Sequence, residues 1–383
     1  LENFEMKKSL VALAALAATS AFAQVTIDGY FDRGYIATNS TDNTKDSKLV
    51  GSNAGTTTIG FKVVEALGGG NSIGLSVNTD WADISGANQD STATTASSIQ
   101  TGGFANSQSF VHFNSGMGTL RLGTPNNFTL TNAIAVASPA FSTGIGSAYS
   151  SGFSIANGLG TGVVGSVGIV SQQAAITSTA NAGVRAIRIA NTVQYSSPAM
   201  NGFTAHLGST FKNSNAGTGT DTVGVTEYAL RYTNGPVDAM YTSIQYKVGD
   251  TAPAFPTGTT AITAGISSKQ NLLGASYAVL PTLKLHAGFG SNTSSNDVFK
   301  GTSTQMGATY TMGAWDVMGQ YVKVDDQSTN NVDRKMVGLG VNYNLSKTTR
   351  AYLRYDDINY YSNGTASAGS AQKRTALGMS VNF

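Results

Sequence analysis

The feature that most constrains this chain is an alternation, with a period of two residues, between large apolar side chains and small or polar ones. It is clearest at the C-terminus, in residues 375–383, where every second side chain from Leu377 to Phe383 is large and apolar. Successive side chains of a β-strand point to opposite faces, so each such segment forms a strand with one apolar and one polar face. The pattern recurs about sixteen times along the chain.

The composition places these strands in a membrane. Only 11% of the residues are charged and 45 are glycine, while apolar residues reach 40% and never gather into a second long run. Soluble domains usually carry more charge, and a transmembrane helix needs about twenty consecutive apolar residues. A barrel averages lipid-facing apolar and lumen-facing polar residues into such a composition. A membrane sheet must close so that every backbone group is paired. We therefore predict an all-β, transmembrane antiparallel β-barrel of about sixteen strands.

The N-terminus has the organisation of a secretory signal peptide. Two lysines after Met6 precede a short apolar run at Leu10–Ala18, and an Ala-x-Ala site ends at Ala23. This pattern predicts cleavage after Ala23, with residues 1–23 comprising an upstream extension and the signal. The alternative is an uncleaved anchor. Residues 24–383 are expected to form a single barrel domain.

Short and long connections alternate along the mature chain, as they do between the periplasmic turns and the extracellular loops of outer-membrane barrels. The long connections, rich in Ser, Thr, Asn and Gly, are 38–54, 83–105, 125–187, 248–268 and 361–372. The sixteen expected strands are 25–37, 55–65, 72–82, 106–114, 118–124, 188–196, 202–212, 222–233, 237–247, 269–279, 282–290, 303–311, 314–325, 334–344, 348–360 and 373–383.

One connection, residues 125–187, is far longer than an ordinary loop, and loops of this length are usually functional or disordered. It contains several large apolar residues, among them Phe128, Phe141 and Tyr149, and is too apolar for a freely solvated tail. We expect it to fold inward against the barrel wall and narrow the lumen. These three aromatic residues are then candidates for shaping the constriction.

The charges are unevenly distributed. From Ser91 to Thr220 there is no Asp or Glu, and the cations Arg121, Arg188 and Lys212 fall on the lumen-facing parity of their strands. Lys62, two strands earlier, shares that parity. Basic side chains at a constriction favour anions, so these four residues are the candidates for charge selection. The alternative is that they pair with lumen acids outside the span, for which the candidates are Asp28, Asp32, Glu65, Glu227 and Asp356.

Four segments of the sequence, 60–70, 118–123, 188–198 and 338–352, resemble motifs of the general porins of betaproteobacteria, and they occur in the family's order. The resemblance implies a sixteen-stranded, trimeric, passive channel whose third loop folds into the pore. It also implies that the terminal Phe383 is a recognition signal for the barrel-assembly machinery.

The chain departs from the family pattern at several basic and acidic positions. Thr58, Gln108 and Thr124 stand where the family commonly has arginine, and Ala66 replaces an aspartate beside Glu65. The electrostatics of the lumen therefore cannot be carried over from the family and must come from this chain's own residues.

Two functions remain open. The first is a diffusion channel for small hydrophilic solutes and ions, weakly anion-preferring, in the outer membrane with its lipid and lipopolysaccharide. The second is a structural or adhesive barrel with a closed lumen. No catalytic or metal motif is present, since the three histidines lie on separate expected strands and there is no cysteine. We expect no enzyme activity and no cofactor. The net charge of +2 is too small to imply nucleic acid.

Overall fold

The computed structural model describes most of residues 24–383. The described residues are 23–40, 45–80, 105, 107–148, 191–210, 214–215, 220–221, 224–247, 267–295, 300–327, 331–362, 365–366 and 371–383. The expected signal peptide, apart from Ala23, lies outside them, as do Arg188, Lys212 and Tyr149. Within the described residues no helix is long and apolar enough to cross a membrane.

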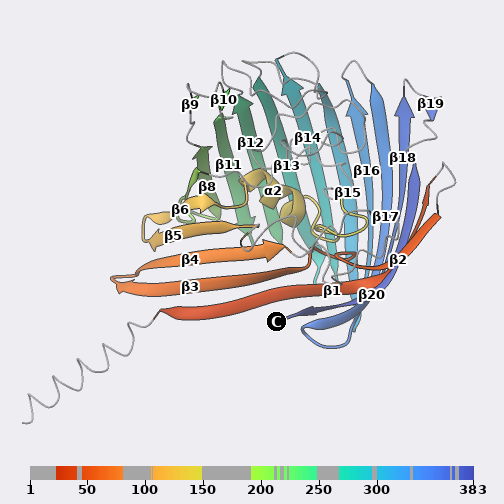
Figure 1. Ribbon diagram of the computed structural model, residues 1–383, viewed down its shortest axis with the longest axis horizontal. Coiled ribbons are helices and arrows are strands. Elements are labelled where there is room, and N and C mark those ends of the chain that lie inside the picture. The colour runs from red at the N-terminus through yellow and green to blue at the C-terminus, as the bar shows by residue number, and fades with distance from the viewer. Residues whose placement is uncertain are drawn as a thin grey trace, which may run out of the picture.

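Sixteen strands of the described chain form one closed antiparallel barrel, with β1 paired to β3 on one side and to β20 on the other (Figure 1). They are β1 (Gln24–Ser40), β3 (Thr58–Gly68), β4 (Asn71–Asp80), β5 (Ser109–Ser115), β6 (Gly118–Thr124), β7 (Thr192–Ser196), β8 (Phe203–Thr210), β11 (Gly224–Asn234), β12 (Val237–Lys247), β13 (Ser267–Leu280), β14 (Leu283–Ser294), β15 (Lys300–Met312), β16 (Trp315–Asp326), β17 (Val332–Asn344), β18 (Thr349–Ser362) and β20 (Gln372–Asn382).

The predicted barrel and its sixteen strands are thus confirmed, although several boundaries move. β14 runs to Ser294, four residues beyond its expected end, because its polar residues continue to pair with β13 and β15. Such extensions carry no apolar alternation, so the sequence pattern ends before the ladder does. Four short strands were not expected: β2 (Lys45–Gly51), β9 (Ser214–Asn215), β10 (Thr220–Asp221) and β19 (Thr365–Ala366). β2 lies within the expected loop 38–54 and pairs with the second half of β1.

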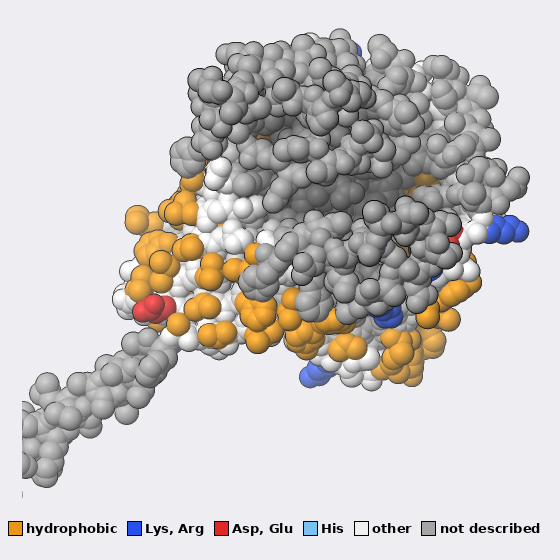
Figure 2. All heavy atoms as spheres, viewed as in Figure 1, with side chains coloured by type: hydrophobic (Ala, Val, Ile, Leu, Met, Phe, Trp, Pro, Cys, Tyr) orange, Lys and Arg blue, Asp and Glu red, His pale blue; other side chains and the backbone are white. Residues whose placement is uncertain are grey.

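The alternation of faces is also confirmed. Phe203 and Leu207 on β8 are exposed on the outside, while Gln194 on the neighbouring β7 is buried on the inside. Figure 2 shows a broad area of hydrophobic side chains on one outer face of the barrel. A charge facing lipid at mid-depth would cost about 2–4 kcal/mol, which explains why the strands keep one parity apolar.

The C-terminus completes the barrel. Phe383 exchanges two backbone hydrogen bonds with Gly29 on β1, at 3.0 and 3.1 Å, and its ring stacks on Phe31 with 5.8 Å between centroids. A Cβ atom at Gly29 would lie 2.4 Å from the ring of Phe383, so only glycine leaves room for it. The last residue therefore has a packing role in closing the sheet.

Residues 125–148, which begin the long connection after β6, lie inside the barrel against its wall (Figure 1). They form a short helix, α2 (Phe128–Thr131), a π-helical turn, η1 (Asn132–Val136), and an irregular segment to Ala148. We call these residues the inner segment. Residues 149–187 lie outside the described residues, so the folding of the whole connection into the pore stays a prediction.

Candidate functional site

The inner segment begins at a carboxylate of the wall. Glu227, on the inward face of β11 and only 2% exposed, accepts hydrogen bonds from the backbone N–H groups of Phe128 and Thr129 at 2.9 and 2.6 Å. It also accepts the hydroxyl of Thr129 at 2.6 Å. The first N–H groups of a helix have no partner within it, and the cap residue Asn127 supplies no side-chain bond. A residue 98 positions away in the sequence thus caps α2.

The middle of the segment is held by one amide. The side-chain Nδ2 of Asn132, fully buried, donates to the carbonyl oxygens of Met240 on β12 and Leu272 on β13, both at 2.9 Å. On either side of Asn132 in the sequence, Phe128 and Val136 form a buried apolar cluster with Ala229 and Met240 of the wall. The interior of this part of the barrel is packed like the core of a soluble domain.

The end of the segment is fixed to β16 and β18. Ser138 donates to Oε1 of Gln320 at 2.5 Å, and Nε2 of Gln320 donates to the carbonyl of Gly146 at 3.2 Å. The backbone N–H of Gly146 donates to Asp356 at 3.0 Å. A Cβ atom at Gly338 on β17 would lie 2.8 Å from Cα of Gly146, so glycine at this wall position allows the two backbones to meet.

A second support comes from the connection between β2 and β3. The backbone N–H of Ile145 donates to the carbonyl of Asn53 at 2.7 Å. The adjoining Ala54 and Gly55 donate their N–H groups to Asp32, at 2.5 and 3.1 Å, and this carboxylate also accepts the hydroxyl of Tyr352. The inner segment is therefore fixed on one side of β1 by the connection that leads into β3 and on the other side by Asp356 of β18.

The structure places only some of the residues predicted to select charge. Arg121 lies on the inward face of β6, partly buried, with its guanidinium 6.0 Å from the ring centroid of Phe110 and 3.5 Å from the hydroxyl of Ser196. Lys62, on β3, forms an ion pair with Asp28 of β1. The two are three strands apart, roughly 14 Å at the spacing of neighbouring strands, so they do not form one cluster.

The predicted aromatic residues are placed in part as well. Phe128 and Phe141 are 5% and 1% exposed, buried between the inner segment and the wall. Their rings hold the segment in position rather than face open lumen. Tyr149, Arg188 and Lys212 lie outside the described residues.

The candidate acids have several different partners. Asp356 pairs with Arg374 of β20, at 2.5 Å, while Asp32 and Glu227 accept hydrogen bonds from backbone and hydroxyl groups. A further ion pair that sequence reasoning missed joins Arg231 to Asp238 across β11 and β12, at 2.7 Å. Asp316, on the inward parity of β16, accepts from Thr311 and Asn344 at 2.8 and 2.9 Å.

Two arginines of β18, Arg350 and Arg354, also lie on the inward face. Arg350, partly exposed, donates to Ser380 and to the hydroxyl of Tyr30, at 3.0 and 3.3 Å. Arg354 is 2% exposed and donates to Asn342 at 2.7 Å. Among the described residues, neither these two arginines nor Arg121 forms an ion pair with a carboxylate. Their even spacing along β18 is the sequence signal that places both on the lumen face.

A closed sixteen-stranded barrel with an apolar outer face, a polar inner face and a segment tied inside it defines a transmembrane β-barrel of the channel-forming kind. The model of the Gram-negative porin family matches residues 9–364, so this chain belongs to that family. It is an integral outer-membrane β-barrel and a diffusion channel.

Solved structures share the fold. An anion-selective porin from Comamonas acidovorans aligns with a TM-score of 0.70 and 22% identity, covering 94% of this chain and 100% of that one. A loop-deletion mutant of OmpT from Vibrio cholerae aligns with a TM-score of 0.62 and 15% identity over 94% and 99% of the two chains. Salmonella typhi OmpF, in complex with daunomycin, gives 0.59 and 14% over 94% and 97%. A comparison with curated proteins finds no match.

Proposed function

We propose that this porin passes small hydrophilic solutes and ions by passive diffusion, with a weak preference for anions. The observation that carries the proposal is a difference in pairing and exposure between the inward acids and the inward arginines. Asp28, Asp238 and Asp356 are each paired with a cation, and Asp32 and Glu227, which have neutral partners, are only 2% exposed. Arg121 and Arg350 are partly exposed and have only neutral partners among the described residues. A net positive wall of low dielectric concentrates anions at the pore.

The preference is weak for two reasons. Asp316 is an inward acid held by neutral partners, which offsets part of the positive charge. Arg354, although cationic, is almost fully buried and lies away from mobile ions. The porin from Comamonas acidovorans, which shares the fold, is anion-selective, in agreement with this direction.

The remaining parts of the proposal follow the family. The full connection 125–187 sets the size limit, Arg188 and Lys212 add to the positive wall, and three copies assemble into a trimer. Residues 1–23 are removed on export, and Phe383 serves the assembly machinery as well as the packing at Gly29. Lipopolysaccharide surrounds the barrel in the outer leaflet.

The test is the reversal potential of single channels of the refolded chain in a planar bilayer, under a tenfold KCl gradient. The wild type is expected to favour chloride. Arg121→Glu and Arg350→Glu should each shift the permeability ratio toward potassium, by about fivefold if the reversed charge acts on the order of 1 kcal/mol at an effective dielectric constant near 20. Unchanged potentials in both variants would remove these arginines from the selectivity of the pore.

The same recording distinguishes the diffusion channel from the second candidate function. A structural or adhesive barrel with a closed lumen would fold and insert but give no current steps. Sustained silence from a chain that shows heat-modifiable migration, the signature of a folded barrel, would favour that function over the channel.

A further inference from the structure

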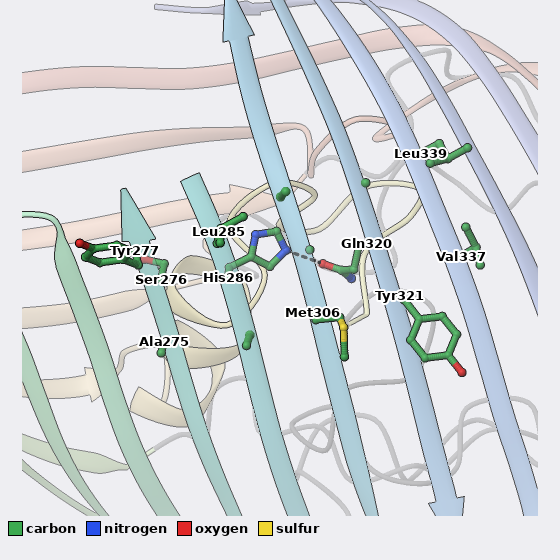
Figure 3. Close-up of a pocket in the computed structure, with 14 residues that line it drawn as sticks. Ala275, Ser276, Tyr277, Leu285, His286, Met306, Gln320, Tyr321, Val337 and Leu339 are labelled. Carbon is green, nitrogen blue, oxygen red and sulfur yellow. Dashed lines mark hydrogen bonds between the residues drawn. The ribbon is translucent and has the colours of Figure 1, made fainter. Parts of the chain in front are cut away.

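The outer face of the barrel carries a groove over five adjacent strands, β13 to β17, with a cavity volume of about 670 Å³ (Figure 3). Its floor is made of small residues at outward positions. Ala275 pairs with Ala287 across β13 and β14, and Ala308 pairs with Gly319 across β15 and β16. Because the two pairs lie in successive rows of the sheet, the floor runs diagonally across four strands.

Large side chains border this floor. Met306 and Tyr321 continue the row of Ala275 and Ala287, and they are 54% and 39% exposed. Leu285, 42% exposed, and Leu339, 51% exposed, flank Ala308 and Gly319 in the next row. The lining is apolar almost throughout. Its size is in the range of cavities that hold small ligands, and its position on the lipid-facing wall makes hydrocarbon the medium that fills it.

A pair of lysines lies directly beyond one end of the groove. Lys323 of β16 and Lys335 of β17 are cross-strand partners on the outward face, two residues past Tyr321 and Val337 toward the ends of the strands that carry the longer loops. Both are exposed. Within the part of the chain that the structure describes, neither forms an ion pair, and Lys335 instead contacts the ring of Tyr361 at 4.8 Å.

Two like charges placed opposite each other destabilise a sheet unless an anion lies between them. The acids near the lysines on this face have other contacts: Asp325 accepts from Gln327 at 2.8 Å, Asp333 accepts from the N–H of Asp326 at 3.0 Å, and Asp357 of β18 pairs with Lys373 at 3.5 Å. Asp325 and Asp333 lie on the side of the lysines away from the groove, and Asp357 is the cross-strand partner of Val337 beside it. A lysine pair at the membrane surface, joined to an apolar groove below it, complements a molecule with an anionic head and a hydrocarbon tail.

We propose that this face is a binding site for one phosphate-bearing lipid, whose headgroup lies between Lys323 and Lys335 and whose acyl chain occupies the groove. Along β16 the outward residues from head to tail are Lys323, Tyr321 and Gly319, a span of roughly 13 Å at 3.3 Å per residue. The site goes beyond conduction, because Lys323, Lys335 and the large side chains that border the groove are on the outward face.

The groove can be filled without strain. A Cβ atom at Gly319 would have its nearest neighbours at 3.6 Å, from Leu339, and 4.0 Å, which is ordinary contact. Gly319→Leu therefore places a side chain in the groove while leaving the backbone unchanged. Ala308→Leu, at the paired position, is a second variant of the same kind.

The experiment is native mass spectrometry of the refolded full chain in a nonionic detergent, titrated with phosphatidic acid and with phosphatidylcholine of the same acyl chains. The wild type is expected to bind phosphatidic acid more tightly. K323S/K335S should lose that preference, on the order of fivefold per lysine. The control K269S/K347S, which removes two exposed lysines elsewhere, should keep it. Gly319→Leu and Ala308→Leu should weaken binding of both lipids, because the chain is excluded.

Three outcomes would overturn the proposal. Equal lipid preference in K323S/K335S and wild type would exclude the lysine pair as the headgroup site. Inorganic phosphate that competes as well as phosphatidic acid would make the groove irrelevant. Loss of oligomers in Gly319→Leu and Ala308→Leu would assign the groove to contact between copies. Single-channel conductance equal to wild type in each variant verifies that the barrel is folded.

Discussion

Two parts of the barrel wall, one covered by the inner segment and one that the described residues leave uncovered, differ in what their inward positions carry. Where the inner segment packs, on β11 to β18, the inward side includes fully buried apolar residues such as Met240, Leu272 and Met336. On β3 to β6, inward positions carry Lys62, Arg121 and polar residues. Inward positions are therefore buried where the inner segment packs on the wall, and they face the lumen where it does not. Strand parity decides which face a residue is on, and the inner segment decides whether an inward residue is buried.

The largest expected effect comes from removing the cap of α2. Glu227→Ala would leave two buried N–H groups without acceptors, at about 1–3 kcal/mol each, and should release the start of the inner segment. We expect larger and noisier single-channel conductance.

The matched control for that variant is Glu65→Ala, an exposed acid of the uncovered side, which should leave the conductance steady. Glu227→Gln keeps one acceptor oxygen and should fall between the two. If Glu227→Ala gave wild-type current traces, the carboxylate would not be what holds the segment.

A smaller effect is expected from crowding the contact at the other end of the segment. Gly338→Val would push against the backbone of Gly146 and should destabilise the folded barrel by about 1–3 kcal/mol, the usual range for overpacking. Urea unfolding followed by gel mobility measures it. Gly319→Val, on the neighbouring strand β16 but facing outward, is the control, because a Cβ atom there would make only ordinary contacts. Equal stability of the two variants would contradict the contact between Gly338 and Gly146.

On the part of the wall that the inner segment does not cover, breaking one ion pair should make the inward face more positive. Asp28→Asn frees Lys62 and should raise the anion preference by about twofold or less, because pairs as exposed as this one contribute roughly 0–1 kcal/mol. Reversal potentials measure the change. A shift toward potassium would mean that the lysine had been lost from the lumen together with its partner.

The smallest effect is expected from salt. Raising the mean KCl concentration from about 0.1 to 1 M shortens the Debye length from about 10 to 3 Å, so the partly exposed Arg350 should lose most of its influence. Reversal potentials at a fixed concentration ratio should move toward the nonselective value. A preference independent of salt would point to cations that are shielded from solvent, such as Arg354.

Most of the strands could be predicted because each is a local pattern of ten or so residues. The anchors of the inner segment could not. Glu227 lies 98 residues from Thr129, and Asp356 lies 210 residues from Gly146, with no local signal that links them. The sequence likewise could not assign ion-pair partners to Lys62 and Asp356. Strand parity identifies the inward charges, but it does not show which of them form pairs.

The sequence by itself determined that this chain closes into a membrane barrel, since alternation fixes the face of each side chain and lipid forces every backbone group to pair. It also assigned Lys62, Arg121 and Asp356 correctly to the inward face, whereas Glu65, expected as a lumen acid, lies on the outward parity of β3. Only the tertiary structure decided which of those charges are neutralised, which part of the wall is buried under the inner segment, and where small outward residues line up into a groove. These depend on strand register and on contacts between distant residues, because the neighbours of a side chain across a sheet lie far away along the chain.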